Sequence, residues 1–185
     1  MCVVQTCPNE ILLEESVTTV DQLSWFAVLT RPRFEKKVTV ELQEKSITAF
    51  LPLNPVLNRW SDRRRLVHLP LFPGYTFVRT SNSLESRVSV LRTSGVTSFV
   101  GVRGIGTPIP DREIEAIQAV LERKVPFEFY PYAKVGQQVR IRGGFLDGVT
   151  GTLAAVNGDQ SLIVSVNLIQ RSIAMRVSGF EIEEI

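Results

Sequence analysis

The sequence is poor in the residues that build metal sites, disulfide frameworks and many catalytic centres. Its 185 residues include two cysteines, Cys2 and Cys7, and a single histidine, His68. Two thiols close together near one end of the chain cannot staple a fold, and one histidine without further cysteines cannot complete a zinc site. These shortages predict a cytoplasmic protein without a metal or a cofactor.

Long apolar runs and catalytic constellations are also missing. No apolar run reaches the roughly 18 residues that span a bilayer, and the N-terminus lacks a basic-then-apolar signal pattern. His68 has no acidic or nucleophilic residue beside it, and no pairing of a nucleophile with a base is visible elsewhere. We therefore expect no membrane partner and no enzymatic activity.

The small net charge of +2 hides a strong partition along the chain. Residues 1–22 carry four acids and no lysine or arginine, whereas residues 23–125 carry sixteen basic against nine acidic residues. Residues 126–185 are close to neutral, with five basic and six acidic residues. The excess positive charge of the middle segment indicates an anionic partner there, although a merely solvated basic surface is the competing explanation.

The middle segment alternates short apolar strands with amphipathic helices. The run WFAVL at 25–29 predicts a strand, and the spacing of Phe34, Val38 and Leu42 predicts a helix that ends near residue 46. Residues 70–78, with two prolines, a glycine and three aromatics, predict a tight turn into a central strand. After a weaker helix at 83–91 and a strand at 96–102, a helix capped by Asp111 follows. The pattern is typical of an antiparallel sheet with helices packed on it.

The last third of the chain is different. Residues 124–132 contain four aromatics and two prolines and are interpreted as a linker, and beyond them short β-rich runs alternate with glycine turns. We predict an α+β protein with an acidic tail at 1–22, a sheet-and-helix domain at 23–123, a linker at 124–132 and a small β-barrel at 133–185.

Several runs in this order resemble the NusG family of transcription elongation factors. The amino-terminal (NGN) domain of that family is similar to WFAV at 25–28, RFEKKV at 33–38, LFPGY at 71–75, GVTSFV at 95–100 and PIPD at 108–111. The KOW module of the family is similar to GFLDGVTG at 144–151, which follows the strand VRIR at 139–142. The arginine-rich run at 63–65 and the run PLFP at 70–73 are closer to specialised paralogues such as RfaH, so a general and an operon-specific factor both remain open.

The resemblance implies a polymerase-binding surface. In the family, the segment around residues 71–75 helps to form an apolar cleft that grips the clamp helices of the largest RNA polymerase subunits. The residues carried over are Phe26, Phe72, Pro73 and Tyr75, with Ser86 and Arg87 at a second contact across the polymerase cleft; the competing interpretation is that the aromatics only fill the core.

The resemblance also implies a nucleic-acid surface and a second protein partner. Upstream or non-template DNA would meet the basic cluster and its neighbouring loop, namely Arg31, Arg33, Lys36, Lys37, Arg92 and Thr93. On the KOW module, Phe145, Leu146 and Val149 would form an apolar rim that recruits a ribosomal protein or Rho, unless they pack inside the barrel.

The sequence therefore predicts a monomeric, non-enzymatic elongation and antitermination factor. It would bind RNA polymerase and nearby DNA through its first domain and recruit the second partner through its barrel. The alternative is a translation-linked RNA-binding protein that acts on the ribosome, because KOW modules also occur in ribosomal proteins.

Overall fold

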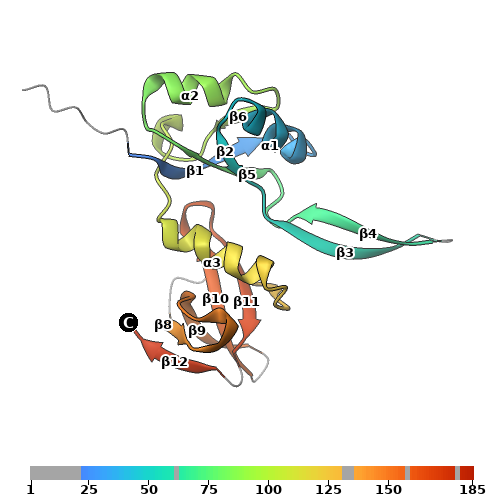
Figure 1. Cartoon of the computed structure of the whole chain (residues 1–185), viewed down its shortest axis with the longest axis vertical. Coiled ribbons are helices and arrows are strands. Elements are labelled where there is room, and N and C mark those ends of the chain that lie inside the picture. Colours follow the sequence, from blue (N-terminus) through green and yellow to red (C-terminus); the bar gives the residue numbers. More distant parts are fainter. Residues whose placement is uncertain (1–21, 61–62, 131–135, 157–158, 178–179) are drawn as a thin grey trace, which may run out of the picture.

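The computed structural model describes residues 22–60, 63–130, 136–156, 159–177 and 180–185. The expected acidic tail therefore lies almost wholly outside the described residues. Within them, twelve strands form two sheets and a separate hairpin, and three α-helices accompany them (Figure 1). No helix in the described ranges is both long and apolar enough to cross a bilayer.

The first sheet is antiparallel and has the strand order β2-β5-β1-β6. Its strands and helices are β1 (Ser24–Thr30), α1 (Glu35–Glu44), β2 (Thr48–Phe50), β5 (Tyr75–Thr80), α2 (Leu84–Leu91) and β6 (Val96–Phe99). Successive side chains of β1 point to opposite faces of the sheet, which explains why both faces are apolar. Phe26 and Val28 pack on one face with Val38 and Leu42 of α1, and Trp25 and Ala27 belong to the cluster on the other face.

A long two-stranded hairpin projects from this sheet (Figure 1). Strands β3 (Leu53–Trp60) and β4 (Arg63–Pro70) pair only with each other, in a register that sets Val56 opposite Val67. The tip at residues 61–62 is outside the described residues. A hairpin without further strands has no second layer on which to bury its apolar side chains, so several of them stay exposed.

Helix α3 (Asp111–Glu122) lies between the first sheet and the C-terminal strands (Figure 1). Its apolar stripe includes Ile114, Ile117 and Val120, as the sequence predicts. The predicted cap is wrong: Pro110 occupies the N-cap position and Asp111 is the first helical residue. The carboxylate of Asp111 lies 3.4 Å from the guanidinium of Arg79 on β5 instead.

The C-terminal part is a curled antiparallel sheet of six strands in the order β12-β8-β9-β10-β11-β7 (Figure 1). Its strands are β7 (Glu128–Tyr130), β8 (Gln137–Arg142), β9 (Thr150–Val156), β10 (Asp159–Val166), β11 (Arg171–Arg176) and β12 (Glu181–Glu184). The α+β class and the order of the two parts are confirmed. The expected linker differs, because residues 128–130 form β7 and pair with β11. Phe129 and Tyr130 favour a strand in that position.

Candidate binding surfaces

The turn between β4 and β5 is held rigidly at both ends. Tyr75 N–H donates to the carbonyl of Phe72 (3.2 Å), and Leu71 N–H donates to the carbonyl of Pro52 (2.8 Å). Gly74 has a φ of +83°, a region that glycine adopts without steric cost, and its N–H donates to the carboxylate of Glu35 (2.8 Å). The turn is therefore fixed to the first residue of α1.

Phe72 belongs to a buried aromatic cluster centred on Phe77. Its ring meets Phe77 edge-on at a centroid distance of 6.2 Å, and Phe50 stacks on the same Phe77 at 6.2 Å. Phe72 is only 2% exposed, whereas Tyr75 is half-buried and Pro73 is exposed. In this conformation only Tyr75 and Pro73 offer surface for a partner.

Phe26 does not join this cluster, which corrects the grouping that the resemblance implies. Its side chain is on the opposite face of the sheet, where it meets Phe99 edge-on at 5.9 Å and is 2% exposed. The period of two along β1 places Trp25 on the side of Phe72 instead, with its ring 6.4 Å from Phe50. Because residues 25–28 are expected to form a strand, the alternation of side-chain directions already predicts that Trp25 and Phe26 lie on opposite faces.

The Phe72 cluster continues without a break into the C-terminal sheet. One contiguous group of buried residues joins Leu71 and Phe72 to Ile114 and Ile117 of α3 and to Leu162 of β10. A polar contact strengthens the same junction: the carboxylate of Glu113 accepts the backbone N–H of Asn167 (3.0 Å) and its side-chain amide. Helix α3 therefore connects the two parts of the molecule as one packed unit.

Ser86 and Arg87 lie on α2, away from the turn. Ser83 caps this helix by accepting the N–H of Ser86 (3.2 Å), and the hydroxyl groups of Ser81, Ser83 and Ser86 lie within 3.0 Å of one another. The guanidinium of Arg87 lies 6.0 Å from the centroid of the Phe99 ring, and its buried Nε has no hydrogen-bond partner. Both residues are half-buried.

The basic cluster is exposed and gathers where the sequence predicts it. Arg31, Arg33, Lys36 and Lys37 surround the start of α1, and all four are exposed. Arg31 N–H donates to the carbonyl of Gly95 (2.8 Å), which brings the exposed Arg92 loop next to the cluster. Four exposed cations therefore lie around the start of α1, and a fifth, Arg92, lies on the loop that Arg31 contacts.

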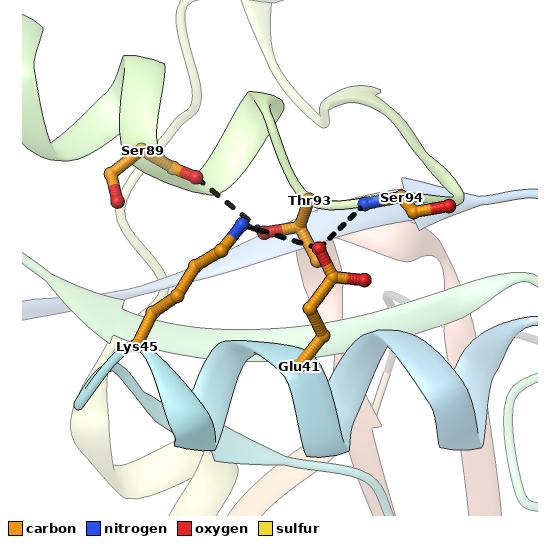
Figure 2. A network of polar contacts seen from close by, with 5 residues as sticks. All are labelled: Glu41, Lys45, Ser89, Thr93 and Ser94. Carbon is orange, nitrogen blue, oxygen red and sulfur yellow. Dashed lines mark hydrogen bonds and ion pairs between the residues drawn. The ribbon is translucent and has the colours of Figure 1, made fainter.

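Thr93 is a correction to the predicted nucleic-acid surface. It is 2% exposed, and its hydroxyl accepts a hydrogen bond from Lys45 Nζ (2.8 Å; Figure 2). The same lysine pairs with Glu41 (3.3 Å), and Glu41 accepts the N–H of Ser94 (3.1 Å). The hydrogen bond from Ser94, with the charge of Lys45, lowers the pKa of Glu41. Thr93 thus positions the loop and is not available to a ligand.

The predicted apolar rim of the C-terminal sheet is mostly core. Leu146 is fully buried and Val149 is 5% exposed, which agrees with barrel packing as the competing interpretation. Phe145 is 56% exposed, and its ring meets Phe180 edge-on at 5.3 Å. Phe145 is therefore the one exposed member of the predicted trio.

No group of three histidine, cysteine or acidic side chains that could hold a metal ion occurs in the described ranges of the chain. The candidate binding features are the aromatic turn, the basic cluster beside it and the small C-terminal sheet.

Comparison with known proteins identifies the family. The family model described as transcription termination factor nusG matches residues 23–118, more than half of the chain. The transcription termination/antitermination protein NusG of Halalkalibacterium halodurans is 27% identical over 88% of this chain and 98% of its own length. The NusG protein of Neisseria meningitidis is 29% identical over 87% of this chain and 97% of its own. The chain belongs to the NusG family, whose members are transcription factors and not enzymes.

A solved structure supports the fold. The structure described as domain interaction in Thermotoga maritima NusG matches with a TM-score of 0.52 and 23% identity, covering 89% of this chain and 98% of that one. The likeness extends over both parts of the molecule, which agrees with the sheet-and-helix part followed by a β-rich part.

Proposed function

We propose that this protein is an elongation and antitermination factor that binds RNA polymerase through the aromatic turn at residues 71–75. The observation that carries the proposal is the placement of this turn beside the exposed cations of α1, to which the Glu35–Gly74 hydrogen bond fixes it. A protein surface and a phosphate surface held side by side suit a polymerase that carries nucleic acid.

Tyr75 and Pro73 make the first contact in this proposal, because they are the accessible members of the turn. Phe72 supports them from inside the core, where its ring contacts Phe77. Aromatic side chains in a groove are frequent anchors for an amphipathic helix. Ser86 and Arg87 would form the second polymerase contact.

The basic cluster would hold upstream or non-template DNA. Phosphate contacts by Arg31, Arg33, Lys36, Lys37 and Arg92 give affinity without sequence information. The C-terminal sheet would recruit a ribosomal protein or Rho through Phe145, and the short connection between the parts would raise the concentration of that partner near the polymerase.

Binding of the purified full chain to RNA polymerase tests the proposal. Tyr75→Ala and Phe72→Ala should weaken binding to the polymerase. Phe145→Ala should leave it unchanged, because Phe145 belongs to the C-terminal part and not to the aromatic turn. Circular dichroism of each variant separates lost binding from lost folding. Equal binding by all three variants would move the interface elsewhere, and no binding by the wild type would exclude a polymerase-binding factor.

The DNA contact has its own test. Changing Lys36 and Lys37 to glutamine should reduce the salt dependence of binding to single-stranded DNA by about 1.4 in the log-log slope, as expected for two lost phosphate contacts. Lys124→Gln, an exposed cation outside the cluster, is the matched control. An unchanged slope in the double variant would show that these lysines do not touch phosphate.

A further inference from the structure

An apolar groove lies where the base of the β3–β4 hairpin meets the start of α1. It has a volume of about 730 Å³. Val56, Val67 and Leu69 line it from the hairpin, Pro73 from the aromatic turn, and Phe129 from β7. The groove therefore touches the start of α1, the hairpin, the aromatic turn and the edge of the C-terminal sheet.

The apolar lining of this groove is open to solvent. Leu69 is 48% exposed, Phe129 is 62% exposed and Val56 is 36% exposed. Val56 and Val67 are paired across the hairpin, so both side chains lie on the same face. A cluster of exposed apolar side chains of this kind is typical of an interaction surface.

The rim of the groove is positively charged. Arg33 and Lys36 line it and are exposed. Glu35 also lines the groove, but it is 5% exposed and its carboxylate already accepts the Gly74 N–H. An occupant that matches this surface combines apolar side chains with carboxylates.

The chain itself contains such a segment before β1. Residues 10–15 read EILLEE, three consecutive apolar residues flanked by three glutamates, and residues 1–22 contain no lysine or arginine. These residues lie outside the described part of the structure.

The segment is long enough to reach the groove. The groove lies at the far end of β1, where Thr30 N–H donates to the carbonyl of Gly74 (2.8 Å). The seven residues of β1 cover about 23 Å. The chain between Leu13 and Ser24 spans up to about 35 Å when extended, so it can turn back along the strand.

We infer that residues 11–13 of the same chain dock in the groove, with Glu14 and Glu15 beside Arg33 and Lys36. The short connection gives the segment a high effective concentration, so few contacts suffice for binding. Because the docked glutamates would occupy two cations of the basic cluster, the segment would compete with nucleic-acid phosphates for them.

The two cysteines make a direct test possible. A nitroxide spin label on Cys7, in a full chain with Cys2→Ser, places a paramagnetic centre four residues from Ile11. The amide signals of Val56, Val67, Leu69 and Phe129 should lose intensity, and that of Ile182 on β12 should keep it. Full intensity at all four groove amides would overturn the inference.

Two further samples show what holds the segment and where it comes from. Leu12→Ser with Leu13→Ser keeps every acid and should restore the groove signals; persistence of the loss would mean that charge alone attracts the segment, and would contradict docking. A mixture of spin-labelled chain without isotopes and isotope-labelled chain without cysteines should show no loss. A loss in that mixture would assign the groove to a second copy and overturn the intramolecular inference.

Discussion

The first sheet and the C-terminal sheet solve the same packing problem in different ways. The first sheet is apolar on both faces and needs α1 and α2 on one side and α3 on the other. The C-terminal sheet curls around its own core, with Val139, Ile141 and Leu162 fully buried, and borrows only α3. The sheet that depends on helices also carries the basic cluster, which surrounds the start of α1.

The two parts also differ in the charges and aromatic rings on their surfaces. The first part presents its cations and its aromatic turn on elements fixed by hydrogen bonds to α1. The C-terminal part is near neutral, and its exposed aromatic rings include Phe129 on β7 and Phe145, which contacts the half-buried Phe180. The shared cluster through α3 determines how independent the two parts are.

The largest effect should come from removing a central ring of the first part. Phe77 is fully buried and contacts both Phe50 and Phe72. Phe77→Ala should cost about 3–5 kcal/mol of unfolding free energy, through lost burial and the cavity left behind. Ile141→Ala, at a fully buried position of β8, is the matched change in the C-terminal sheet.

Calorimetry of both variants measures the coupling between the parts. Because the core cluster is continuous, each variant should lower one common transition. Two separate transitions, each moved by only one variant, would show that α3 does not couple the sheets.

Glycine substitutions should separate a crowded turn from an open one. Gly95 has a φ of +99°, and an added Cβ would lie 2.8 Å from Cδ1 of Phe34, whereas Gly148 has a φ of +83° and nothing within 4 Å of such an atom. Gly148→Ala should cost about 1–2 kcal/mol for the left-handed backbone alone. Gly95→Ala should cost more and weaken DNA binding, because it displaces the loop that carries Arg92. Equal losses of stability in urea titrations would contradict this account.

The junction between the two parts should be sensitive to Glu113. Glu113→Gln keeps the shape but replaces one acceptor oxygen of the carboxylate by a donor amide, and it should cost about 1–3 kcal/mol. Hydrogen exchange at the Asn167 amide should become faster. Glu115→Gln, an exposed change two residues away on α3, should leave that amide as it is. If the Asn167 amide kept its protection from exchange in Glu113→Gln, the hydrogen bonds of Glu113 would not stabilise the junction.

The smallest expected effect is on the titration of two glutamates at acidic pH. The pKa of Glu41 is lowered by the Ser94 hydrogen bond, and the pKa of Glu183 on β12 is lowered by the hydrogen bond from Arg142 (2.6 Å). Each contribution is present above the ordinary glutamate value of about 4.5 and is lost as the pH falls through the lowered pKa. Carboxyl carbon NMR titration should therefore find both midpoints below 4.5. In Lys45→Gln the Glu41 midpoint should rise and that of Glu183 should stay; a rise in both would contradict the local cause.

The sequence predicts most of the fold because β1 is a continuous apolar run and because α1 and α3 have apolar residues at helical spacing. It does not predict the pairing of β7 with β11, since a three-residue strand carries too little pattern to distinguish it from a linker. The four cations at the start of α1 follow from one stretch of sequence at 31–37, whereas the approach of Arg92 depends on the backbone contact between Arg31 and Gly95. The burial of Phe72, Leu146 and Thr93 does not follow from the sequence, because it depends on which distant elements cover them.

Hydrogen exchange of the full chain with and without RNA polymerase tests the central claim most directly. The account predicts added protection at residues 71–75 and at the start of α1, and none at β8. Protection confined to the C-terminal sheet, with the turn at 71–75 unchanged, would contradict the claim that this aromatic turn is the polymerase-binding surface.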